Sequence, residues 1–210
     1  MRKFFAILLM ITLVFTFTSC GGTSKTQTDQ LTPTETADKF LAGLKAKDLE
    51  AVEEYYEGDI GDLTMLEEED EPALADVINA MVDKIFDFDY VLGNEKIDGD
   101  SATVEVELTT YDFGGIIQEI MGGLMEDAFA LKLTGMSQEE MEAEINELIG
   151  GKFKEALDNA AKDHTIKVPM ELTRKDGKWV VKDLASSKDF LNALSGGLME
   201  LADSLQEAEG

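Results

Sequence analysis

Two Asp-Gly turns, each flanked by segments of alternating apolar and polar residues, most constrain the fold of this 210-residue chain. The turns are Asp98-Gly99 and Asp176-Gly177, and the flanking segments are 86–92, 102–109, 166–173 and 178–184. Alternation with a period of two predicts half-buried strands, and a tight Asp-Gly turn predicts an antiparallel hairpin. Pro169 has no backbone N–H, so we expect its strand to be a sheet edge or to carry a bulge there.

Most of the chain between and around the two hairpins has the apolar spacing of amphipathic helices. The spacing predicts helices over 33–44, 48–56, 72–86, 115–133 and 137–162, and a last one from 187 to the tail. Thr32 and Glu35, and again Ser137 and Glu140, have the spacing of a capping box. The predicted order is therefore α-α-α-β-β-α-α-β-β-α.

This order predicts an α+β fold, because antiparallel hairpins with segregated helices do not build a doubly wound parallel sheet. We expect N-terminal helices packed on a curved antiparallel sheet of about four strands, which form two hairpins. A two-helix insertion separates the hairpins and a C-terminal helix follows them. Residues 33–210 suit a single domain, and they contain no cysteine, so only an apolar core can stabilise it.

The N-terminus has the features of a secretory signal. Residues 1–3 are positively charged overall, residues 4–17 are apolar apart from two threonines, and Phe17-Thr18-Ser19-Cys20 follows. The apolar stretch matches a signal peptide and is short for a membrane-spanning helix. The motif around Cys20 resembles the lipobox of bacterial lipoproteins, although Phe17 stands where that pattern prefers leucine. An ordinary secreted protein cleaved elsewhere is the alternative.

The lipoprotein resemblance implies a signal peptide over 1–19 and a lipid, such as palmitate, on Cys20. Residues 20–32 are mostly Gly, Thr, Ser, Gln and Lys, a composition typical of a flexible tether. The expected location is the extracytoplasmic face of the cell membrane, with the lipid anchor as the contact to the membrane.

The charge of the chain excludes one class of partner. With 18 Lys+Arg against 44 Asp+Glu, the formal net charge is −26. Such a chain offers no basic patch for the phosphates of a nucleic acid. The acidic residues are interpreted as a solvated surface; attraction of cations or of a basic partner is the alternative.

Three segments resemble the NTF2-like (cystatin-like) superfamily, and in particular small lipoproteins of unknown function from Gram-positive bacteria. They are residues 34–52, 100–106 and 176–181. The resemblance implies helices packed on a curved sheet with a cone-shaped pocket. The long helical segment 114–163 and the terminal helix depart from that pattern. The superfamily includes isomerases, dehydratases and non-catalytic binders, so the fold does not select a function.

No residue pattern in the chain predicts a catalytic or metal centre. His164 is the sole histidine and is expected in a surface linker. Nucleophile, phosphate-loop and dinucleotide motifs are missing from the sequence, and we expect no cofactor. Calcium is the one metal for which the chain offers candidate ligands, since Asp59, Asp62 and the acidic run 67–71 supply carboxylate oxygens. The sequence lacks the twelve-residue calcium loop, however. The prediction is therefore no metal site.

Tyr90 and Tyr111, together with Asp87 and Asp89, are the residues considered for proton transfer. Alternation along the strand places Tyr90 and the two aspartates on opposite faces, which argues against an enzyme. A second feature is a set of methionines at helical spacing, which are interpreted as core filling, with an adaptable binding surface as the alternative. They are Met121, Met125, Met136 and Met141.

The sequence thus favours a non-enzymatic, lipid-anchored binding domain for a small molecule or an envelope protein. The alternative is an isomerase- or hydrolase-like enzyme that uses a carboxylate in the sheet cavity. Self-association through a sheet edge or through the Gly-Gly pairs at 122–123 and 150–151 is a third hypothesis.

Overall fold

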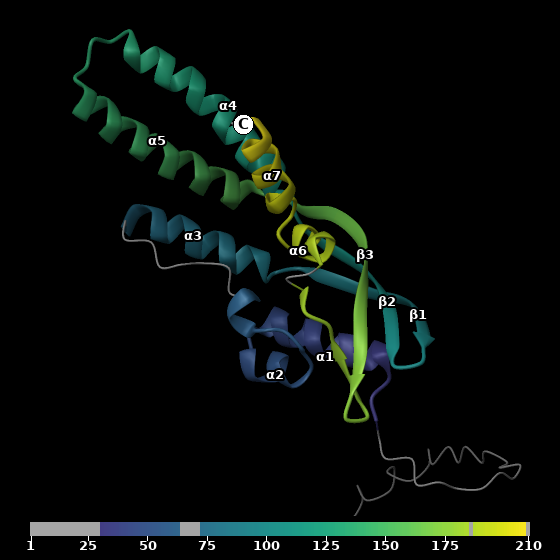
Figure 1. Cartoon of the computed structure of the whole chain (residues 1–210). Helices are drawn as coiled ribbons and strands as arrows, with labels where there is room; N and C mark the ends of the chain where they lie inside the picture. The colour runs from purple at the N-terminus through teal and green to yellow at the C-terminus, as the bar shows by residue number, and fades with distance from the viewer. Residues whose placement is uncertain (1–29, 64–71, 185–186, 209–210) are drawn as a thin grey trace, which may run out of the picture.

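The structure, a computed structural model, describes residues 30–63, 72–184 and 187–208. The predicted signal peptide 1–19, Cys20 and most of the tether 20–32 lie outside these ranges. The helices and strands are shown in Figure 1. In chain order they are α1 (Pro33–Ala46), α2 (Leu49–Glu54), a 3-10 turn η1 (Ile60–Leu63), α3 (Pro72–Ile85), β1 (Asp89–Asp98), β2 (Ser101–Tyr111), α4 (Phe113–Lys132), α5 (Gln138–Asn159), β3 (Lys162–Lys175), β4 (Lys178–Val181), α6 (Lys188–Leu194) and α7 (Leu198–Ala208).

The four strands form one antiparallel sheet in the order β1-β2-β3-β4. The predicted α+β fold is confirmed. Asp176 and Gly177 have φ angles of 50° and 83°, as a two-residue turn between β3 and β4 requires. The prediction that the strand of Pro169 is a sheet edge or carries a bulge there is wrong, because β3 lies between β2 and β4 and pairs with β2 in regular register at Pro169. The proline is accommodated because β4 pairs with Leu172–Lys175, so Pro169 lies beyond the paired part of β4 in the described sheet.

The main core lies between the inner face of the sheet and helices α1 and α6. Alternate residues of β2, namely Val104, Val106 and Leu108, are fully buried, as the period-two pattern requires. Strands β3 and β4 add further side chains to this inner face, and helices α1 and α6 supply the side chains that oppose it. Together they include Phe40, Leu41, Leu44, Met170, Leu172, Val181 and Phe190.

The predicted helix starts are largely those observed. Thr32 and Ser137 each form the expected capping box with the glutamate three residues later. Helix α4 begins two residues earlier than predicted, at Phe113, because the Asp112 carboxylate accepts a hydrogen bond from the Gly115 amide at 2.9 Å.

The predicted last helix is two helices, α6 and α7. Gly196 and Gly197 separate them, with φ angles of 56° and 86°. This backbone conformation is readily available only to glycine. The Gly114 amide donates to the Gly196 carbonyl at 2.8 Å, so the break packs against the start of α4.

Helices α4 and α5 form an antiparallel hairpin that extends away from the sheet (Figure 1). A second, smaller core lies at its base, where Tyr111, Phe113 and Leu157 are buried against α3 and α7. None of the helices in the described ranges has both the length and the apolar character needed to cross a bilayer.

Candidate ligand-binding cleft

The inner face of the sheet is filled with side chains. Val104, Leu108 and Met170 have no exposed surface, because Phe40, Phe190 and their neighbours cover them. In the described part of the chain, the sheet cavity that the enzymatic alternative needs is thus occupied by packed side chains.

An apolar cleft of about 390 Å³ lies beside this core, between α3 and the α6–α7 pair. Its walls come from one face of each helix. They are formed by Leu44, Met81, Val82, Ile85, Phe86, Leu191, Leu194, Ser195, Leu198, Met199, Ala202, Asp203 and Gln206. Small-molecule sites in proteins commonly have volumes of about 300–1,000 Å³ and mostly apolar walls with a few polar groups.

The polar lining of the cleft is confined to three side chains. Ser195 is buried, and its hydroxyl donates to the Asn192 carbonyl at 3.3 Å. Asp203 pairs with Lys188 at 3.3 Å on the exposed side of α7. Gln206 is exposed one turn further along. The cleft thus offers apolar contact throughout and hydrogen-bonding groups along α7.

Sequence reasoning missed this cleft because it treated 187 to the tail as one continuous helix. The break at Gly196 and Gly197 turns α7 toward the start of α4, which leaves space between α7 and α3. The signal was present as Ser195-Gly196-Gly197, since two adjacent glycines are poor helix formers.

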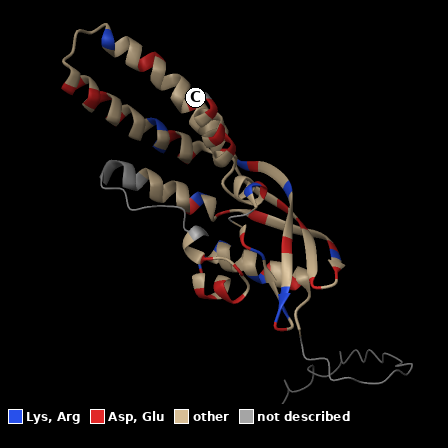
Figure 2. Ribbon diagram, in the orientation of Figure 1, with Lys and Arg blue, Asp and Glu red and all other residues tan. Residues whose placement is uncertain are grey.

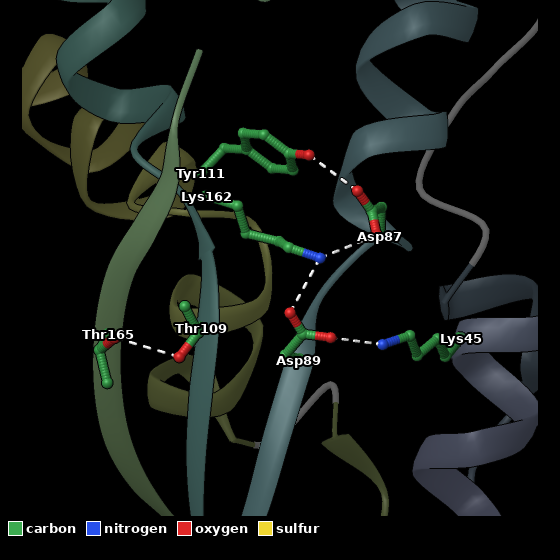
Figure 3. Close-up of polar contacts among 7 residues, drawn as sticks. All are labelled: Lys45, Asp87, Asp89, Thr109, Tyr111, Lys162 and Thr165. Atoms are coloured by element: carbon green, nitrogen blue, oxygen red, sulfur yellow. Dashed lines mark hydrogen bonds and ion pairs between the residues drawn. The ribbon is translucent and has the colours of Figure 1, made fainter.

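The tyrosine and carboxylate residues weighed for catalysis do form a cluster, shown in Figure 3. The Tyr111 hydroxyl donates to Asp87 at 2.7 Å. The Lys162 ammonium contacts Asp87 at 3.0 Å and Asp89 at 2.9 Å, and Lys45 contacts Asp89 at 2.6 Å.

The alternation predicts Tyr90 on the opposite face from Asp87 and Asp89, and it makes no prediction for Tyr111, which contacts Asp87. Strand β1 begins at Asp89, so Asp87 precedes the strand and the alternation of side chains along β1 does not set its direction. Its carboxylate reaches the Tyr111 hydroxyl at the end of β2. Tyr90 points the other way and donates to the Asp38 carboxylate at 2.9 Å.

The hydrogen bonds and charges of this cluster stabilise the deprotonated carboxylates of Asp87 and Asp89 and the protonated ammonium of Lys162. The Tyr111 hydrogen bond, followed by that of Lys162, lowers the pKa of Asp87. The Lys45 hydrogen bond does most to lower the pKa of Asp89, and the Asp89 hydrogen bond does most to raise the pKa of Lys162. A general acid or base needs a pKa moved toward neutrality. We therefore interpret the cluster as a structural network that joins α1, β1 and β3.

The remaining predicted residues are dispersed. His164 lies within β3 opposite Thr110, and not in the linker that was expected. Cys20 and the acidic run 67–71 lie outside the described residues. Within the described ranges, no group of three or more His, Cys, Asp or Glu side chains is arranged to hold a metal ion.

The methionine prediction is wrong for three of its four residues. Met121, Met125 and Met136 are exposed, and Met141 is half-buried. The predicted core does not form because α4 and α5 extend beyond the sheet as a two-helix hairpin, which cannot enclose residues on its outer faces. These side chains lie apart from the cleft.

Comparison with known proteins adds little to this picture. No protein-family model and no curated protein matches the chain. One solved structure, described as a "putative lipoprotein (ycdA)" from Bacillus subtilis, matches with a TM-score of 0.38 and 18% identity. The match covers 59% of this chain and 38% of the other, so this chain spans well under half the length of that protein.

Proposed function

We propose that this protein is a lipid-anchored, extracytoplasmic binding protein that takes a small apolar or amphiphilic ligand in the cleft between α3 and α7. The observation that carries the binding role is the 390 Å³ cleft with apolar walls. The observation that carries the location is the lipobox-like motif ending in Cys20. We also propose that the fold is a variant of the NTF2-like fold, which segments 34–52, 100–106 and 176–181 resemble.

The cleft selects for ligand chemistry through two features. Apolar walls favour a hydrocarbon or aromatic body, and each buried CH₂ adds about 0.8 kcal/mol to binding. Asp203 and the net charge of −26 disfavour an anionic head group. We expect a neutral or cationic amphiphile whose polar end lies near Asp203 and Gln206.

A neutral fluorescent probe tests the binding role. N-phenyl-1-naphthylamine gains fluorescence in apolar sites, and we expect saturable binding to the full chain. Ala202 lines the cleft from α7 and is exposed, so Ala202→Phe fills the cleft without disturbing the core. Ala42→Phe is the matched control, because Ala42 is an exposed helical alanine of α1 outside the cleft lining.

The expected result is that Ala202→Phe abolishes the saturable signal and Ala42→Phe leaves it unchanged. Equal binding by both variants would place the probe elsewhere and refute the cleft as the site. The anchor has a separate test, since Cys20→Ala should release the protein from membranes. A membrane-bound Cys20→Ala protein would refute lipid anchoring and leave the cleft result intact.

A further inference from the structure

A row of large apolar side chains is exposed along the outer face of α4 and continues past its end. We call it the α4 stripe, and it consists of Met121, Met125, Phe129, Leu133 and Met136. A spacing of four residues places the first four on one face of a helix. Their exposed fractions range from 43% for Met121 to 77% for Met125, with 67% for Phe129 and 74% for Leu133.

The hairpin seam does not account for the stripe. Leu124, Ala128 and Leu131 are half-buried and lie on another side of α4, which packs against both α5 and α7. The stripe residues lie on a different side of the same helix, so α4 has two apolar faces and the fold covers one of them. In a chain of net charge −26, such an uncharged face is an exception to the rest of the surface.

The size of the stripe matches one half of a small protein interface. With the exposed fractions of its five residues, and with roughly 200 Å² for a fully exposed large side chain, the stripe presents about 600 Å². Two such faces together bury about 1,200 Å², above the roughly 1,000 Å² that a specific interface needs. A single face of this size is at the upper end of what monomers expose.

We infer that two copies of this chain associate through their α4 stripes, with the two α4 helices antiparallel. A two-fold axis makes a stripe its own partner, since apolar residues of one copy meet the same residues of the other. The axis passes near residue 127, the middle of the segment from Met121 to Leu133. Lys132 of one copy then lies opposite Gly122 of the other.

The charges beside the stripe favour this antiparallel arrangement over a parallel one. Glu119 and Glu126 are exposed within a turn of Gly122, and Lys132 is exposed at the other end of α4. Antiparallel pairing brings Lys132 toward the two glutamates of the second copy, whereas parallel pairing brings like charges together. A Cβ added at Gly122 would have no atom within 4 Å, so the face is open for the approach of a second helix.

The same charges disfavour the other occupants of this face. Helices that lie on membranes carry Lys and Arg on the polar side, whereas α4 is bordered by Glu119 and Glu126. The neighbouring helix α5 is also acidic toward the hairpin tip, as Figure 2 shows, which would repel an anionic bilayer. This acidity also explains why the copies would meet through α4 and not through α5.

Site-directed crosslinking in cells that make the full chain tests the proposal. Met125→Cys and Phe129→Cys lie on either side of the proposed axis, and a short bismaleimide would join two copies at either position. Ala143→Cys, on an exposed site of α5, is the matched control. The unaltered chain, whose sole cysteine is Cys20, sets the background.

We expect a dimer band at 125 and 129 and only background at 143. Glu126→Lys alone and Lys132→Glu alone should each lower the dimer yield by about threefold, and the two together should restore it. Equal yields at all three cysteines, or no dimer at any, would overturn the proposal. A crosslink from position 125 or 129 to a different protein would also overturn it, as would cysteines that a water-soluble maleimide cannot reach because lipid covers them. A double variant whose dimer yield is no higher than that of the single variants would overturn the antiparallel arrangement.

These outcomes are separable from the fate of the proposed ligand cleft. Met125 is largely exposed and lies outside the lining of the cleft, so Met125→Lys should abolish the dimer band while probe binding persists. A protein that binds the probe and does not crosslink would refute the dimer alone. A protein that crosslinks and does not bind the probe would refute the cleft alone.

Discussion

Replacing Gly196 by alanine should be among the most damaging single-methyl changes in this protein. Gly196 lies in the break between α6 and α7, where the backbone of one segment touches that of another. An added Cβ would overlap the carbonyl oxygen of Tyr111 and lie 3.0 Å from a ring carbon and 3.1 Å from the amide nitrogen of Phe113. Backbone atoms cannot rotate away as the end of a flexible side chain can, so α7 or the start of α4 must shift.

The expected loss has two parts. The φ angle of 56° costs a residue with a Cβ about 1–2 kcal/mol. Overpacking against a fixed backbone typically adds about 1–3 kcal/mol. The combined loss of about 2–5 kcal/mol is a large share of the roughly 5–15 kcal/mol that stabilises a typical domain.

Two other glycines separate these parts. Gly197 has a φ angle of 86°, but the nearest atom to an added Cβ is 3.8 Å away, so Gly197→Ala should lose only the conformational part, about 1–2 kcal/mol. Gly151 lies within α5 with no atom within 4 Å of an added Cβ. Gly151→Ala should therefore raise the stability by about 0.5–1 kcal/mol.

Urea unfolding monitored by tryptophan fluorescence measures all three variants. Trp179 is the sole tryptophan, and it is buried in β4 with the Arg174 guanidinium 4.4 Å from its ring centre. Its emission therefore reports on the main core. If Gly196→Ala loses no more free energy of unfolding than Gly197→Ala, the close backbone approach is absent and the reasoning fails.

Three further predictions concern polar side chains. The Thr110 hydroxyl is buried and has no hydrogen-bond partner among the described residues, so Thr110→Val should raise the free energy of unfolding in urea by about 1 kcal/mol, and a decrease would reveal a partner. Burial, followed by the Asp38 hydrogen bond, raises the pKa of Tyr90 to about 12. Stability should thus fall as pH rises from about 10 toward 12, and less so in Tyr90→Phe, as urea midpoints at each pH would show. Because the pKa of Asp87 is lowered in the folded state, its carboxylate should stabilise the fold above about pH 4 and should lose this effect on acidification. Asp87→Asn should therefore be less stable than the unaltered chain at neutral pH and equally stable at about pH 2, and a loss of stability that persists there would contradict this.

The sequence was sufficient for most of the fold because local signals and burial agree there. The capping boxes at Thr32 and Ser137 and the turn at Asp176 act over four residues or fewer, so no distant contact is needed to read them. The alternation of β2 survives in its burial pattern because its inner face packs entirely against the main core.

The candidate site was not predictable for the opposite reason, since each part of it depends on a contact between distant segments. The cleft exists because Gly196 meets Gly114, and the Asp87 cluster forms because the end of β2 returns beside the start of β1. Periodicity records which residues of one element are apolar, but not what will cover them. Met125 shows this limit most plainly: its spacing is that of a core residue, yet the fold leaves it 77% exposed. A helix pattern with two apolar faces is therefore evidence for a second covering surface, and for α4 that surface must come from outside the described fold of one copy.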